Sequence, residues 1–175
     1  MKRAVCLALL AAWLAVPAQA ADRQADQSVK AVFAQLSQLV GAWETSTADG
    51  KSHQVRYRLS ANGYALVETW TLGSTRESIT IYYLDGSRLL ASHFCPQGNV
   101  PRLKLVGARP GSFSFSFVDG ANLKVAGPSH QHSFRIGQLP DGTLERAEYY
   151  VENGKRASPR DEAAVETFRY HRIAQ

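Results

Sequence analysis

Tight-turn dipeptides recur along most of the chain, and they constrain its fold more than any other feature of the sequence. Between them, apolar and polar residues alternate with a period of two. Asn-Gly or Asp-Gly between two alternating segments is a strong signal for a two-residue β-hairpin turn, because both residues of that turn need a positive φ. The dipeptides are Asp49-Gly50, Asn62-Gly63, Asp85-Gly86, Asp119-Gly120, Asp141-Gly142 and Asn153-Gly154. The chain is therefore expected to fold as a succession of antiparallel hairpins.

About ten segments between and beside these turns are predicted β-strands. They span residues 42–48, 53–60, 64–71, 77–84, 88–95, 101–107, 112–118, 129–137, 143–151 and 163–172. No helix is long enough to separate them, so each strand should pair with the next one along the chain. Closing such a sheet removes its unpaired edges. We predict an all-β fold, a single up-and-down antiparallel β-barrel of about ten strands, with a β-sandwich as the alternative.

A short helix is expected before the first strand. Apolar residues at Val29, Phe33 and Leu36 follow helical spacing, and Gly41 is well placed to end the helix. This helix, within residues 28–40, should close one end of the barrel. The longest expected loop, residues 120–128, is a candidate lid at a barrel mouth.

The first twenty residues have the pattern of a secretory signal peptide. Lys2 and Arg3 precede an apolar run, and Ala18-Gln19-Ala20 supplies the small residues of a cleavage site. The apolar run is too short for a transmembrane helix, and no later segment is as long. We expect residues 1–20 to be removed and residues 21–175 to form one domain in the periplasm, with no integral membrane segment.

The charge of the chain gives no sign of a nucleic-acid partner. The formal net charge is +5, and it falls to +3 without Lys2 and Arg3. The remaining Arg and Lys are scattered among acidic residues, whereas a nucleic-acid surface needs clustered positive charge. We expect no nucleic-acid partner, and a monomer or a weak dimer.

Two pairs of side chains carry the chemical information of the chain. His93 and Cys95, and likewise His130 and His132, lie two residues apart in a predicted strand, so the members of each pair should face the same side. His130 and His132 share their phase with apolar residues further along the strand, which favours the inward side. Because consecutive strands run in opposite directions, both pairs should lie at one mouth of the barrel and His171 at the other end.

These two pairs allow more than one chemistry. Imidazole nitrogens with a thiolate could hold a transition metal such as zinc, whereas the alternative is that they are hydrogen-bonded polar residues lining a cavity. Cys95, the only cysteine outside the expected leader, could also act as a thiolate nucleophile beside a histidine. The predicted metal ligands are His93, Cys95, His130 and His132. The predicted ligand-binding residues are these four with Trp70, Asn99, Arg102 and Phe115. We assign no catalytic residue.

Other charged and aromatic residues in the strands have ordinary structural explanations. Glu77 and Glu148 are interpreted as solvated strand charges, since carboxylates are rarely buried unless they are paired. Tyr82 and Tyr150 are interpreted as packing residues. None of these four is included in the predicted site.

The residues at the start of the first strand suggest a family. Gly41-Ala42-Trp43 resembles the G-x-W signature of lipocalin-like (calycin) barrels. In that superfamily a basic residue late in the chain commonly packs over the tryptophan, and the resemblance implies Arg169 for this role, with Arg172 next. Two further segments, Thr80 to Gly86 and His93 to Arg102, resemble a comparable run in a group of uncharacterised bacterial lipocalin-like proteins. That resemblance implies a fold and a shared mouth, because the group has no settled activity.

Haem-binding nitrobindin-like barrels are similar in shape, but they place the haem histidine near the C-terminus. Only His171 is available there in this chain, and it lies apart from the two pairs. Zinc is therefore expected before haem. We expect a periplasmic barrel that binds a small, mainly apolar molecule, with the histidines and Cys95 at its polar end and with or without a metal. The alternative is a thiol- or metal-dependent enzyme that uses Cys95 and the histidines, and we expect a binding protein rather than an enzyme.

Overall fold

The computed structural model describes residues 18–46, 52–73, 76–124, 127, 129–155 and 166–174. Within this part of the chain, the helix α1 (Ala18–Leu36) leads through a 3-10 turn (Ser37–Leu39) into ten strands. They are β1 (Gly41–Ser46), β2 (Ser52–Ser60), β3 (Ala65–Leu72), β4 (Arg76–Asp85), β5 (Arg88–Phe94), β6 (Val100–Arg109), β7 (Ser112–Ala121), β8 (Ser129–Gln138), β9 (Leu144–Glu152) and β10 (Glu166–Arg172). Most of the expected leader (residues 1–17), the turn at Asp49-Gly50, and Val125, Ala126 and Pro128 of the expected lid lie outside the described residues.

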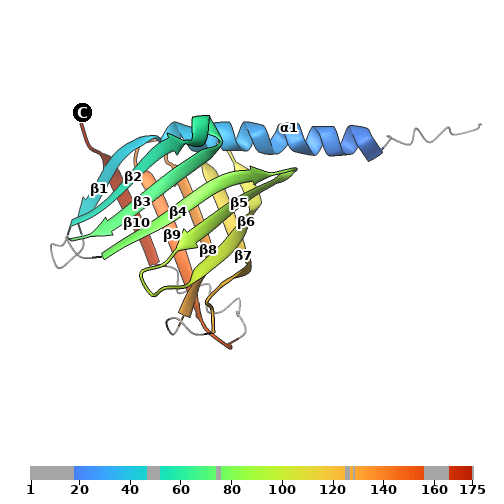
Figure 1. Ribbon diagram of the computed structural model, residues 1–175. Coiled ribbons are helices and arrows are strands. Elements are labelled where there is room, and N and C mark those ends of the chain that lie inside the picture. Colours follow the sequence, from blue (N-terminus) through green and yellow to red (C-terminus); the bar gives the residue numbers. More distant parts are fainter. Residues whose placement is uncertain are drawn as a thin grey trace, which may run out of the picture.

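The ten strands form one closed antiparallel barrel (Figure 1). Each strand pairs with the next along the chain, and β1 pairs with β10, where Trp43 stands opposite Arg172. This arrangement confirms the predicted all-β, up-and-down barrel of about ten strands. Strand direction therefore alternates around the barrel, so the starts of even-numbered strands and the ends of odd-numbered strands share one end.

The turn dipeptides place most of the hairpins correctly. Asn62 and Gly63 have φ of 53° and 88° in a turn between β2 and β3. Asp119-Gly120 is different, because it lies inside β7, and the turn predicted there is wrong. Asp119 instead binds Arg102 across the β6–β7 pair. A Cβ at Gly120 would lie 2.6 Å from the Val100 carbonyl oxygen, so this position needs glycine for close strand packing rather than for a turn.

The helix is longer than the sequence pattern predicts. It begins at Ala18 rather than near residue 28, and it ends at Leu36. Figure 1 shows α1 at one end of the barrel and extending beyond the strands. Its last turn and the 3-10 turn contribute Leu36 and Leu39 to the hydrophobic core. No helix in the described part of the chain is long and apolar enough to cross a membrane.

Trp43 is packed at the end of the barrel where α1 leads into β1. Its side chain is fully buried, and its Nε1 donates to the Leu39 carbonyl oxygen at 2.9 Å. The guanidinium carbon of Arg172 lies 4.2 Å from the centre of the Trp43 ring, within the range of a cation–π contact. Arg169, expected in this role, instead forms an exposed ion pair with Glu145 at 3.2 Å, so that expectation is wrong. Neighbouring strand residues face opposite sides, and Arg169 has the outward phase.

Candidate functional site

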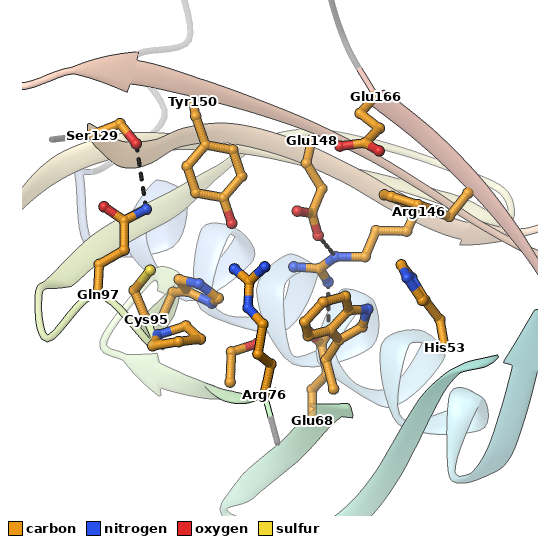
Figure 2. Close-up of a pocket in the computed structure, with 15 residues that line it drawn as sticks. His53, Glu68, Arg76, Cys95, Gln97, Ser129, Arg146, Glu148, Tyr150 and Glu166 are labelled. Atoms are coloured by element: carbon orange, nitrogen blue, oxygen red, sulfur yellow. Dashed lines mark hydrogen bonds and ion pairs between the residues drawn. The ribbon is translucent and has the colours of Figure 1, made fainter. Parts of the chain in front are cut away.

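The barrel contains a cavity of about 410 Å³ (Figure 2). It is lined by His53, Glu68, Trp70, Arg76, Ser78, His93, Cys95, Pro96, Gln97, Ser129, Arg146, Glu148, Tyr150, Glu166 and Phe168. Several of these residues lie at the starts of β2, β4, β8 and β10, and others at the ends of β3, β5 and β9. The cavity therefore occupies the end of the barrel opposite the one where α1 leads into β1.

A row of four polar residues crosses the inner wall beside this cavity. Tyr57, Glu68, Thr80 and His93 stand directly opposite one another on β2, β3, β4 and β5. Each is at most 3% exposed. Directly opposed residues on one face of a sheet have their Cβ atoms about 5 Å apart. The strand register alone therefore brings these side chains within hydrogen-bonding reach.

Glu68 is the centre of a buried hydrogen-bond network. Its Oε2 accepts from the hydroxyls of Tyr57 at 2.9 Å and Tyr82 at 2.7 Å. The same oxygen accepts from Nη1 of Arg146 at 2.7 Å, and Oε1 accepts from the hydroxyl of Thr80 at 3.3 Å. The side chains of Glu68 and Arg146 are only 1% and 2% exposed. A buried ion pair is tolerated only when its remaining polar atoms are also hydrogen-bonded, and this network meets that condition for the Glu68 carboxylate.

Arg146 links Glu68 to a second carboxylate. Figure 2 shows its guanidinium between Glu68 and Glu148, and its Nε donates to Glu148 Oε1. The Glu148 side chain is 17% exposed and lines the cavity. Burial by itself would raise the pKa of Glu148, but the charge and hydrogen bond of Arg146 hold that pKa below its ordinary value. Glu148 is therefore an ionised group on the cavity wall, and its interpretation as a solvated strand charge is wrong.

His93 presents a hydrogen-bond acceptor from a buried position. Its Nδ1 lies 3.0 Å from Thr80 Oγ1. The single hydroxyl proton of Thr80 is already donated to the Glu68 carboxylate, so Nδ1–H must be the donor to Thr80. Burial, reinforced by the positive charge of Arg146, lowers the pKa of His93 to about 4. The ring is therefore neutral at pH 7, with its lone pair on Nε2, a buried atom that has no hydrogen-bond partner.

Cys95 lies in a tight turn directly after β5. Its backbone N–H donates to the Asn99 carbonyl oxygen at 3.0 Å, and the Gly98 N–H donates to the Cys95 carbonyl oxygen at 2.9 Å. The thiol lines the cavity and is partly buried. Burial raises the pKa of the Cys95 thiol, so the thiolate fraction at neutral pH is below that of an ordinary cysteine.

Aromatic rings form another part of the cavity wall. The His53 ring lies 5.1 Å from the Trp70 ring and 5.2 Å from the Phe168 ring, measured between centroids. Nε1 of Trp70 donates to the Tyr170 hydroxyl at 3.2 Å, which fixes the plane of the indole. The cavity therefore combines a charged wall with a rigid aromatic wall.

Three of the residues predicted for the site, His93, Cys95 and Trp70, line the cavity. Asn99 is fully buried and donates to the Ser129 carbonyl oxygen at 2.7 Å, which ties the turn after β5 to the start of β8. Arg102 lies on the outer surface in its pair with Asp119, and Phe115 belongs to the hydrophobic core. These three are not among the residues that line the cavity.

The structure does not bring His130 and His132 into the cavity. A register shift between Gln131 and Ser133 changes the phase of β8 at this point. Gln131 stands opposite the cavity residue Tyr150 and is fully buried, whereas His130 stands opposite Val151 on the other face. His132 is the extra residue of this bulge, so His130 and His132 do not continue the regular inward phase of Phe134 and Ile136, and the phase expected for them is wrong.

His130 and His132 belong to a separate aromatic cluster. Their rings lie 4.6 and 5.6 Å from the Phe117 ring. His132 Nδ1 is 3.4 Å from His130 Nε2, and His130 Nδ1 is 2.9 Å from Asn153 Oδ1. In the described part of the chain, no three His, Cys, Asp or Glu side chains are grouped so that they could hold a metal ion. The four expected metal ligands therefore do not form one site.

Sequence reasoning missed the residues that give the cavity its charge, namely Glu68, Arg146 and Glu148. The phase of these residues within their strands could have indicated that they face inward. Glu68 shares its phase with Leu66 and Trp70 on β3, and Arg146 and Glu148 share theirs with Leu144 and Tyr150 on β9. A charged residue in phase with a buried apolar face is expected to be paired, but its partner on another strand cannot be identified from that pattern.

Comparisons with known proteins found no relative. The chain matches no protein-family model, no curated protein and no solved structure. Its function is therefore inferred from the geometry and chemistry of the cavity.

Proposed function

We propose that this barrel binds a small organic molecule in the cavity opposite α1. The proposal rests on one observation, a cavity of about 410 Å³ inside the barrel. The hydrophobic core of the barrel includes Tyr82, Phe115 and Phe134. Small-molecule sites usually have volumes of about 300–1,000 Å³, so the cavity has a suitable size for a one- to three-ring ligand.

The composition of the wall supports a ligand with one flat face and one polar edge. Trp70 and Phe168 offer apolar ring surface. Arg146 and Glu148 are held by fixed partners, so they would need little rearrangement when a ligand binds. This wall is more polar than the mainly apolar pocket expected from the sequence, and we propose a correspondingly polar edge on the ligand.

Two observations favour binding over the alternative of a thiol- or metal-dependent enzyme. The pKa of the Cys95 thiol is raised by burial, whereas a thiolate nucleophile needs a lowered one. His130 and His132 lie in the Phe117 cluster, outside the cavity that Cys95 lines. Neither histidine is therefore placed to activate the thiol.

A fluorescence titration with N-phenyl-1-naphthylamine tests the proposal. The fluorescence of this uncharged diarylamine increases in apolar sites. We expect saturable binding to the purified protein. A Cys95→Phe variant, which fills part of the cavity, should weaken binding by about tenfold or more. The matched control is Lys104→Phe, since Lys104 is exposed on β6 and should leave the affinity unchanged. Absence of saturable binding, or equal affinity in the Cys95→Phe variant, would refute the proposal.

A further inference from the structure

We propose that the polar edge of the cavity is a hydrogen-bond acceptor site, centred on Nε2 of His93, for a flat molecule that carries an N–H donor and no negative charge. The inference rests on the proposed binding function and names the chemical class of the ligand. An aromatic amine or an N–H heterocycle fits this description, in its neutral or its cationic form.

The hydrogen-bond network fixes the tautomer of His93. Both oxygens of Glu68 accept hydrogen bonds, from two tyrosine hydroxyls, from Arg146 and from Thr80, so Glu68 acts toward Thr80 as an acceptor. Thr80 gives its proton to Glu68 and must accept from His93 Nδ1. Reversing the His93–Thr80 bond would leave two oxygens 3.3 Å apart with no proton between them. The other ring nitrogen, Nε2, is therefore an acceptor.

This acceptor has no hydrogen-bond partner within the described structure. His93 is 3% exposed and lines the cavity, and its Nε2 is buried without a hydrogen bond. A buried polar atom without a partner costs folding free energy. A ligand that donates an N–H to this atom would recover that cost, whereas a ligand with only acceptors would place two lone pairs in contact.

The charged side chains of the cavity disfavour an anionic ligand. The cavity is lined by three acidic side chains, Glu68, Glu148 and Glu166, and by two basic ones, Arg76 and Arg146. The acids exceed the bases by one, and Glu148 lines the same cavity as His93 without being fully buried. A carboxylate or sulfonate on the ligand would meet this excess negative charge in a partly desolvated space. An uncharged or positively charged donor would not.

Three matched probes separate these requirements. N-phenyl-1-naphthylamine carries one N–H, 1-phenoxynaphthalene replaces that N–H by an ether oxygen, and 8-anilinonaphthalene-1-sulfonate keeps the N–H and adds a negative charge. We expect the amine to bind the wild-type protein about tenfold more tightly than either of the other two. Affinities are measured by isothermal titration calorimetry, so that the result does not depend on probe brightness.

Variants of His93 assign the preference to one atom. His93→Leu should bind the amine and the ether equally, and His93→Gln, whose side-chain carbonyl can accept, should keep part of the preference for the amine. His132→Leu removes a histidine outside the cavity and should keep the full preference.

The wild-type comparison stands even if a His93 variant fails to fold. Equal affinity of the wild-type protein for the amine and the ether would overturn the acceptor site while leaving the binding function in place. A preference that survives in His93→Leu would also overturn it. Failure of all three probes to bind would overturn the binding function and the acceptor site together.

Discussion

The two histidine-containing pairs have the same spacing in sequence but different surroundings in the fold. His93 and Cys95 lie along and just beyond β5, and both line the cavity. His130 and His132 lie on β8, where their rings contact Phe117 and each other. The difference arises from one extra residue in β8, because a single-residue shift moves side chains to the opposite face of a strand.

An H-x-H or H-x-C pattern places both side chains on one face of a strand only where the strand pairing stays regular. On β5, His93 keeps the inward phase of Leu89 and Ala91, and its partner Thr80 lies on the neighbouring strand β4 and donates in turn to Glu68. On β8, the residue that reaches the cavity side is Gln131, between the two histidines.

The largest effect is expected from the arginine in the buried wall. Arg146→Leu leaves Glu68 and Glu148 without their common cation, and losing one partner of a buried ion pair costs about 3–5 kcal/mol of unfolding free energy. Arg135→Leu is the matched control, since Arg135 pairs with Glu145 at 3.0 Å on the surface and is 53% exposed. We expect the control to cost less than about 1 kcal/mol. Urea denaturation measures both, and similar losses in the two variants would contradict the account of the wall.

A smaller effect is expected from pH, through His93. The pKa of this histidine is lowered from 6.5 to about 4 in the folded chain. Between these values the unfolded chain binds a proton that the folded chain does not, so lowering the pH favours unfolding. The contribution is fully present above pH 6.5 and is lost as the pH falls to 4, by about 3 kcal/mol in total.

The control for this pH effect is the His93→Leu variant. Carboxylates also titrate in this pH range, and the variant keeps them while removing the histidine. The unfolding free energy of the wild-type protein should fall more steeply than that of the variant between pH 6.5 and 4. Parallel curves would show that His93 is not buried as a neutral ring.

The smallest effect concerns chemical access to the two pairs. N-phenyl-1-naphthylamine in the cavity should cover Cys95 and slow its alkylation by iodoacetamide several-fold. The rate falls because bound amine lowers the fraction of protein in which the thiol is accessible. A His132→Cys substitution in a Cys95→Ala background places a thiol at the other pair. The amine should leave the alkylation rate of that thiol unchanged. Equal protection at both positions would indicate that the two pairs share one cavity.

The strands could be predicted from the sequence because their signals are local. Alternation and turn dipeptides such as Asn62-Gly63 depend only on neighbouring residues, and strand parity correctly places His93 and Cys95 at the end opposite α1. Asp119-Gly120 misled the prediction because its glycine serves close packing between β6 and β7. An Asp-Gly dipeptide can serve either a hairpin turn or close packing between two strands, and only the tertiary structure shows which role it has.

The charged wall could not be predicted because its pairs are not local. Glu68 and Arg146 are 78 residues apart and meet only after the barrel closes. The bulge in β8 likewise depends on how β8 pairs with β9, and the sequence around Gln131 carries no turn residue that marks it. Arg172 rather than Arg169 covers Trp43 for a related reason, since the phase of β10 is set by its register with β1.

The protonation state of His93 is the most direct test of the account, and nitrogen NMR of protein with isotope-labelled histidine measures it. At pH 7 we predict a neutral His93 ring with a protonated Nδ1 and an unprotonated Nε2, and a shift of the Nε2 resonance when N-phenyl-1-naphthylamine is added. A ring protonated on Nε2, or an Nε2 resonance that does not respond to the bound amine, would contradict the acceptor site at the centre of the cavity.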